Sequence, residues 1–158
     1  MYEIDKIDLD IVNLLFEDGR MPASEIAHRL ENVSERIVRY RIHRMVEEGL
    51  IRVSAVVNPS ILGFSTVADI WLEVEADSII DIAEKVTKFE CVSYVACAIG
   101  KTDISVQIFA KDTEAVYRFV TNTLGKIPGI RKTTTTIVPM ILKDIYQWRI
   151  PSNLGLIE

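Results

Sequence analysis

The chain has 158 residues, 49% of them hydrophobic and 26% charged, which is enough apolar material for one ordinary domain or two small ones. A charged N-terminus and the lack of an apolar run of about 18 residues argue against a secretory signal and a membrane span, so we expect a soluble cytoplasmic protein with no membrane partner. The net charge of −5 argues against a polyanion-binding protein, but residues 33–52 carry five Lys and Arg against three Asp and Glu, a local excess of +2.

Three helices are predicted in residues 1–50. The first runs through "DLDIVNLLFEDGR", which has apolar residues at helical spacing and acidic residues in its first turn, and it ends at Gly19. The second is about two turns long, with Ser24 as its candidate N-cap. The third is capped by Ser34, runs to Glu48 and is closed by Gly49. This order predicts a helix-turn-helix domain.

The predicted third helix has an apolar face that is expected to pack on the first two helices. This face comprises Ile37, Val38, Ile42, Met45 and Val46. A second set of side chains lies at spacings of i, i+3, i+4 and i+7 and points outward together. This second set comprises Arg36, Arg39, Tyr40 and His43.

The outward face of this helix has two interpretations. In the first, it enters the major groove of DNA, where Arg36 or Arg39 could bind guanine and Ser34 or Tyr40 could bind a phosphate. Arg41 and Arg44 flank the face, and they could reach phosphates or fold back onto carboxylates of the first helix. In the second interpretation, the face is solvated and binds nothing.

Residues 51–65 are expected to form a connecting strand and a linker. Apolar residues alternate at Ile51, Val53, Ala55 and Val57, and the pattern stops at Asn58-Pro59. With this strand the N-terminal half would be a winged-type helix-turn-helix domain.

From residue 66 the periodicity predicts a second domain, which ends near residue 143. Its elements are strands at 66–75, 91–100, 103–110 and 129–139, with helices at 78–89 and 112–127. The order βαββαβ is the ferredoxin-like arrangement, one antiparallel sheet with two helices on one face, and the whole chain is therefore α+β.

The predicted sheet carries apolar residues that the two helices would not cover. In the first strand Ala68, Ile70, Leu72 and Val74 suit the covered face, which leaves Val67, Trp71 and two acidic residues on the other. The next two strands are expected to be apolar on both faces. Because such a sheet should not face water, a second copy is its simplest cover, which predicts an isologous homodimer. For residues 144–158 we expect an extra edge strand and then a tail that is loose or docked on a partner.

Cysteine and histidine chemistry is not indicated. Cys91 and Cys97 lie in one predicted strand, roughly 20 Å apart at about 3.3 Å per residue, which is beyond disulfide reach. His28 and His43 lie in different helices, so no zinc-binding spacing exists. We expect no metal and no cofactor.

The order of several motifs resembles the Lrp/AsnC family of feast/famine transcription regulators. The N-terminal half has an Asp-rich start, then Asp-Gly-Arg, a Ser-capped helix with Arg41, and Glu-Glu-Gly before "NPSILG". The second half has Gly100 with Asp103, and then "IPGIRKTTTTIV". The resemblance covers residues 4–143. It implies an ACT-like (RAM) form of the sheet domain, and a homodimer, often assembled into an octamer, that binds pseudo-palindromic promoter DNA.

The resemblance also implies that an amino acid or a related small metabolite binds the sheet domains at subunit interfaces. The residues at the matching positions are Ile99, Gly100, Lys101, Thr102, Asp103, Thr135, Thr136, Ile137 and Val138. Backbone amides of the Gly loop could bind a carboxylate, and Asp103 could accept from an ammonium. Alternatively, the loop is only a tight strand connection. Lys101 and Thr102 depart from the family pattern, which often has an acidic residue and an aromatic there.

Three other functions are less well supported by the sequence. An enzyme is disfavoured because residues 66–158 contain no His and no nucleophile–base pair at a recognisable spacing, which also argues against a haem-precursor decarboxylase of similar architecture. An RNA-binding module is disfavoured because "DISVQIFA" lacks paired aromatics on one face. A metabolite sensor without DNA binding stays open, because residues 1–32 are acidic. We therefore predict a DNA-binding regulator with a ligand-responsive dimerisation domain.

Overall fold

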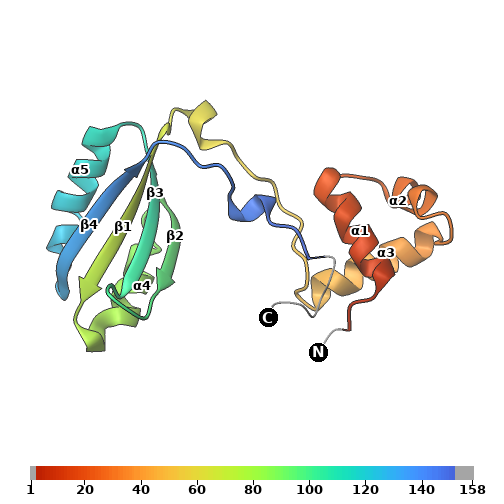
Figure 1. Ribbon diagram of the computed structural model, residues 1–158, viewed down its shortest axis with the longest axis horizontal. Helices are drawn as coiled ribbons and strands as arrows, with labels where there is room; N and C mark the ends of the chain where they lie inside the picture. The colour runs from red at the N-terminus through yellow and green to blue at the C-terminus, as the bar shows by residue number, and fades with distance from the viewer. Residues whose placement is uncertain (1–2, 152–158) are drawn as a thin grey trace. The chain divides into compact units, whose positions relative to one another are not determined.

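The computed structural model describes residues 3–151, which fall into two units (Figure 1). The first unit contains the residues up to Val56 together with the segment that begins at Lys143. The second contains Val57–Leu142. Each unit is built around its own cluster of buried apolar side chains. The C-terminal segment therefore belongs with the N-terminal helices rather than with the sheet that precedes it.

The first unit contains α1 (Lys6–Glu17), α2 (Ala23–Arg29) and α3 (Glu35–Glu47). Ser34 caps α3 as predicted, because its hydroxyl accepts the Ile37 backbone N–H at 3.3 Å. Helix α2 begins two residues earlier than predicted. Pro22 stands at its N-cap and Ser24 lies inside the helix. Proline is well suited to the start of a helix, because its ring fixes φ near the helical value.

The core of the first unit is formed by one side of each helix. Ile11 of α1, Ile26 of α2, and Val38 and Met45 of α3 have no exposed surface. Ile42 packs against this core as predicted. The other two residues of the predicted apolar face, Ile37 and Val46, are each 44% exposed. The buried stripe of α3 is therefore narrower than the sequence suggested, because α1 and α2 cover only one side of it.

The strand predicted over Ile51–Val57 is not formed. Residues 51–58 have no regular structure, and the described part of the first unit contains no strand. A strand needs a neighbouring backbone edge, and none is present in this unit to pair with the alternating segment. The segment leads into a 3₁₀ turn, η1 (Pro59–Leu62), which Asn58 caps and Gly63 ends at φ +85°.

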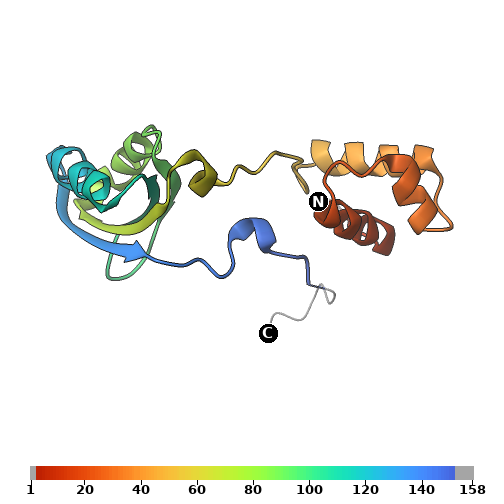
Figure 2. The same cartoon turned by 90° about the horizontal axis from the view of Figure 1, so that it is seen from above.

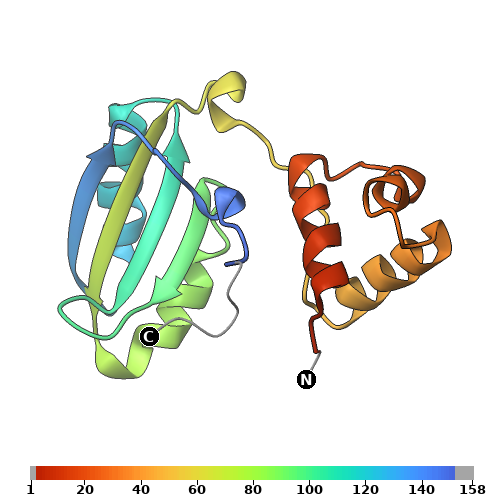
Figure 3. The ribbon, with the colours of Figure 1, turned by 45° about the vertical axis from the view of Figure 1, so that its right-hand side comes forward.

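The second unit has the predicted βαββαβ order. Its strands are β1 (Thr66–Val74), β2 (Val92–Cys97), β3 (Ile104–Ala110) and β4 (Ile130–Val138). Its helices are α4 (Ile79–Val86) and α5 (Thr113–Asn122). The sheet is antiparallel with the order β2-β3-β1-β4, and both helices lie on the same face (Figures 2 and 3). This is the ferredoxin-like topology expected from the sequence.

The helix-covered face of the sheet is as predicted for β1, since Ala68, Ile70, Leu72 and Val74 are all buried. In β3 the expected apolar residues fall on both faces, because alternate residues of a strand share a face and Phe109 lies opposite Val67 on the open side. Ile104, Val106 and Ile108 all point to the covered side.

The open face of the sheet is mixed in character. Trp71 and Phe109 lie half-buried on it, while Tyr94 is 52% exposed. Between them the Gln107 side-chain N–H donates to Asp69 at 2.9 Å. The face that a second copy would cover is thus partly aromatic and partly polar.

The extra edge strand predicted after β4 is absent from residues 139–151. Pro139 follows the last residue of β4 and removes a ladder donor. A 3₁₀ turn, η4 (Ile145–Gln147), follows instead and is capped by Asp144. The rest of the predicted tail, residues 152–158, lies outside the described residues.

In residues 3–151 no helix has the length and apolar character that a membrane crossing requires. The same residues contain no cluster of three or more His, Cys, Asp or Glu side chains that could hold a metal ion. Cys91 and Cys97 are both free thiols.

Candidate functional site

The outer face of α3 presents the predicted polar side chains to solvent. Arg39, Tyr40 and His43 are 69%, 60% and 71% exposed, respectively. Arg36 and Arg44 are exposed as well. Ser34 is occupied in capping the helix, so its hydroxyl fixes the first turn. The helix therefore brings the predicted cationic and aromatic groups together on one accessible surface.

Two of these side chains have carboxylate neighbours one turn away on the same helix. The Arg39 guanidinium contacts Glu35 at 2.6 Å, and His43 Nε2 lies 3.2 Å from Glu47. All four groups are exposed, and exposed i,i+4 pairs contribute only about 0.3–0.5 kcal/mol. A polyanion can therefore displace Glu35 at little cost.

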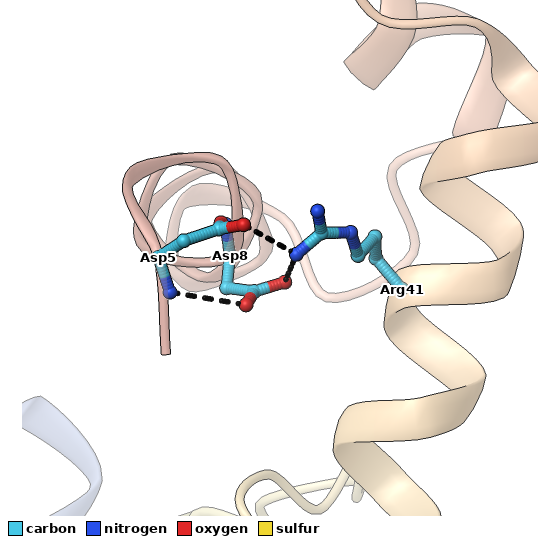
Figure 4. A network of polar contacts seen from close by, with 3 residues as sticks. All are labelled: Asp5, Asp8 and Arg41. Atoms are coloured by element: carbon cyan, nitrogen blue, oxygen red, sulfur yellow. Dashed lines mark hydrogen bonds and ion pairs between the residues drawn. The ribbon is translucent and has the colours of Figure 1, made fainter. Parts of the chain in front are cut away.

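Arg41 differs from the other arginines of α3, because its side chain is only 22% exposed and turns back to α1 (Figure 4). Its Nη1 atom lies 2.7 Å from Asp5 and 3.1 Å from Asp8. The two carboxylates also bond each other's backbone, since Asp8 N–H donates to Asp5 and Asp5 N–H donates to Asp8. The two carboxylates that form the capping box of α1 therefore also bind the Arg41 guanidinium.

The electrostatics of this cluster follow from its geometry. The bond from the Asp8 backbone N–H lowers the pKa of the Asp5 carboxyl, and Arg41 lowers it further. The bond to Asp5, followed by that to Asp8, raises the pKa of the Arg41 guanidinium. Asp8 is fully buried, so removing the Arg41 cation would destabilise the fold through this carboxylate. Of the two alternatives for Arg41, the structure places it on the carboxylates of the first helix.

The predicted ligand-binding residues lie in two segments. The first is the loop between β2 and β3, in which Gly100 has φ +147° and Ile99 is fully exposed. Asp103 accepts the Val74 backbone N–H at 2.8 Å, and Arg131 Nη2 lies 3.9 Å away. The Asp103 carboxylate therefore bonds the end of β1 and also faces the Arg131 guanidinium.

The second segment is the end of β4. By register, Thr136 and Val138 lie opposite Asp69 and Val67 on the open face, and the intervening Thr135 and Ile137 point to the other face at the sheet edge.

The two segments do not meet within one chain. The Asp103 backbone N–H bonds Leu72, and Leu72 lies opposite Thr133, three residues before Thr136. The separation is roughly 10 Å along the strand, with a further strand spacing of about 5 Å between β1 and β4.

Comparison with known proteins gives matches to both units. Residues 4–46 match the AsnC-type helix-turn-helix domain, and residues 67–147 match the Lrp/AsnC ligand-binding domain. The chain belongs to the Lrp/AsnC family. It is a helix-turn-helix DNA-binding transcription regulator with a ligand-binding domain.

Similar Lrp/AsnC proteins come from archaea and bacteria. An uncharacterized HTH-type transcriptional regulator of Pyrococcus horikoshii is 39% identical over 142 residues, which is 89% of each chain. The HTH-type transcriptional regulator LrpA of the same organism is 33% identical over 141 residues, covering 89% of this chain and 99% of LrpA.

Two solved structures are also similar. A transcriptional regulator of Neisseria meningitidis in complex with L-Met has a TM-score of 0.86 and 25% identity, covering 96% of this chain and 98% of that one. AsnC of E. coli has a TM-score of 0.84 at 23% identity, covering 92% and 99%, and shares the fold.

Sequence reasoning left three residues that shape these sites unnamed. Asp5 and Asp8 hold Arg41, and the sequence offered carboxylates of the first helix as one alternative without naming which. Arg131, next to Asp103, stands at the start of the last strand and gave no local signal.

Proposed function

We propose that this Lrp/AsnC protein binds specific promoter DNA as a homodimer, with one α3 helix of each copy in the major groove, and that an amino acid changes its affinity for that DNA. The observation that supports the DNA part most directly is the exposed face of α3, where Arg36, Arg39, Tyr40 and His43 point outward together. The family match over residues 4–46 covers nearly all of this helix.

Each side chain has a role that fits its place. Among residues 3–151 no ion-pair partner is found for Arg36, and we assign it to a base edge, where an arginine reads guanine. We assign Arg39 to a base edge as well, once DNA has displaced its ion pair with Glu35. Tyr40, His43 and Arg44 bind phosphates, and Ser34 fixes the end of the helix. We assign Arg41 to positioning α3 on α1 rather than to DNA.

The acidic total does not oppose this assignment. The negative charge of the N-terminal unit lies mainly in residues 1–32, and Asp5 and Asp8 are paired with Arg41. A dimer would present the +2 segment twice, and two weak surfaces at a fixed spacing bind more tightly than one.

The DNA proposal is tested by fluorescence anisotropy with a labelled fragment of the region upstream of the coding sequence, at 50 and 200 mM salt. We expect salt-sensitive binding, and a loss of about 5- to 150-fold for Arg36→Ala, which corresponds to about 1–3 kcal/mol. Arg118→Ala, an exposed arginine of α5, is the matched control. Binding that is insensitive to salt, or equal in Arg36→Ala and Arg118→Ala, would contradict the proposal.

The effector part of the proposal rests on the ligand-binding domain match over residues 67–147 and on the similar Neisseria structure with L-Met. We propose that the amino acid lies between two copies, with the loop Ile99–Asp103 from one and the end of β4, Thr135–Val138, from the other. Backbone amides near Gly100 would bind its carboxylate. The separation of the two segments within one chain favours such a shared site.

A thermal-shift screen of the twenty amino acids tests this site. We expect at least one amino acid to raise the melting temperature of the wild type, because a ligand that binds only the folded state stabilises it. The rise should disappear in Thr136→Ala and persist in Thr134→Ala, a neighbour outside the proposed set. Asp103→Ala should also lose the response, but it removes the bond to Val74 and lowers the starting temperature as well. No shift with any amino acid would contradict the effector proposal.

The proposal gives the protein no catalytic role and no cofactor, and places it in the cytoplasm with the DNA. The named relatives are transcription regulators, which supports this view.

A further inference from the structure

The C-terminal segment Lys143–Pro151 belongs to the helix-turn-helix unit. The Arg149 guanidinium lies over the Phe16 ring, with Cζ 4.3 Å from the ring centroid. The next residue, Ile150, packs against the core of the helical unit together with Leu15 and Ile51. The segment therefore contacts the C-terminal half of α1.

The segment has a defined local conformation. The Asp144 side chain accepts the Tyr146 backbone N–H at 2.9 Å, and Gln147 accepts the Asp144 backbone N–H at 3.2 Å. This capping box gives residues Ile145–Gln147 a regular 3₁₀ conformation, η4, just before the docked residues.

The docking is loose enough to be reversible. A hollow of about 890 Å³ remains between α1, residues 50–56 and the segment, lined by Val12, Leu15, Tyr146 and Trp148 among others. Tyr146 and Trp148 are 61% and 54% exposed. Because these side chains are half exposed and line an open hollow, the segment buries few contacts, and few buried contacts mean low local stability.

The segment joins two functional parts of the chain. At its start, residues 139–142 separate it from Thr135–Val138, the part of β4 assigned to the effector. At its end it touches α1, the helix whose Asp5 and Asp8 hold Arg41 of α3. The two units are thus linked by the chain twice, once after α3 and once through this segment.

We propose that residues 143–151 form a strap whose docking on α1, through Arg149 on Phe16, couples the end of β4 to the helix that orients α3. The regulatory role of the strap rests on the proposed function. A ligand that orders β4 would then change the affinity of the helix-turn-helix unit for DNA through the strap. Arg149 and Phe16 are positioning residues that touch neither DNA nor ligand.

Hydrogen exchange of the full chain, followed by mass spectrometry without DNA or ligand, tests the coupling. We expect Arg149→Ala and Phe16→Leu each to speed exchange at least threefold in residues 134–142, which neither substitution touches. The double variant should show no more than either single one, because both remove the same contact. Arg20→Ala, an exposed arginine just beyond α1, is the control and should leave these residues unchanged.

The outcomes separate the strap from the proposed function. Unchanged exchange at residues 134–142, or a change confined to residues 143–151, would overturn the strap. Phe16→Leu also alters the core of the helical unit, so Arg149→Ala, whose side chain is exposed, decides if the two disagree. Wild-type DNA binding is measured on the same sample. Its absence would overturn the proposed function, whereas the exchange result would still decide the coupling.

Discussion

At the scale of single residues, α3 contains two kinds of arginine that look alike in the sequence. Arg36 and Arg39 face solvent, whereas Arg41 is held by Asp5 and Asp8 on another helix. The outward group could be predicted because it follows from helical periodicity within seven residues. The partners of Arg41 lie 33 and 36 residues away, a distance over which periodicity carries no information.

Replacing Arg41 should therefore cost stability. Arg41→Ala removes a cation 3.1 Å from the buried Asp8 carboxylate, and we expect the free energy of unfolding to fall by about 3 kcal/mol. Arg39→Ala is the matched control, since its exposed pair with Glu35 should change stability by less than about 1 kcal/mol. Urea unfolding of both variants measures the difference. Equal stabilities would show that Arg41 does not hold α3 on α1.

The same cluster predicts a dependence on pH. Because the pKa of Asp5 is lower in the folded chain than its ordinary value of 3.8, its contribution is complete above that value and is lost as the pH falls toward the folded pKa. The stability difference between the wild type and Asp5→Asn should thus be constant above about pH 5 and should shrink below pH 3.8. Urea midpoints at pH 3, 4, 5 and 7 would reveal it. A difference that grows as the pH falls would contradict the assignment.

At the scale of elements, local signals predicted most of the fold and failed where a partner was needed. Ser34 and the alternation in β1 act within a few residues, and both were confirmed. The strand over Ile51–Val57 and the edge strand after β4 were wrong, because pairing depends on a neighbouring edge that periodicity does not report.

One glycine tests how the sheet domain is closed. Gly129 has φ +91°, and a Cβ there would meet Ile82 Cδ1 at 3.0 Å. Gly129→Ala should therefore lower the stability of this domain by about 1–3 kcal/mol, through backbone strain and the contact with α4. Gly19→Ala, where no positive φ applies and the nearest atom is 3.8 Å away, should change little. The melting temperatures of the two variants provide the comparison, and equal values would argue against a strained turn before β4.

At the scale of the whole molecule, neither proposed site is complete in one chain. The two effector segments are separated across the sheet, and a single α3 carries only a small positive excess. A second copy that packs on the open face of the sheet, where Trp71 and Phe109 are half-buried, would complete both the effector site and the DNA-binding surface. Intermolecular contacts of this kind cannot be derived from periodicity, and the prediction of a dimer came from the uncovered apolar residues and from the family resemblance.

A charge on the open face should dissociate the dimer. We expect Phe109→Glu to shift the sedimentation coefficient from that of a dimer to that of a monomer, because it would bury a carboxylate in the interface. Ile80→Glu places the same charge at a side chain of α4 that is 61% exposed, and it should leave the assembly unchanged. A wild type that sediments as a monomer, or a dimer that persists in Phe109→Glu, would contradict this interface.

In vitro selection from a pool of random DNA duplexes tests the central claim most directly, namely that a dimer reads DNA through two α3 helices. We expect the wild type to enrich an inverted repeat whose half-sites are centred about one helical turn, roughly 10 base pairs, or a whole multiple of it apart. The Arg36→Ala/Arg39→Ala variant should enrich no such repeat. Enrichment of the same repeat by both proteins, or of no sequence by the wild type, would contradict the claim.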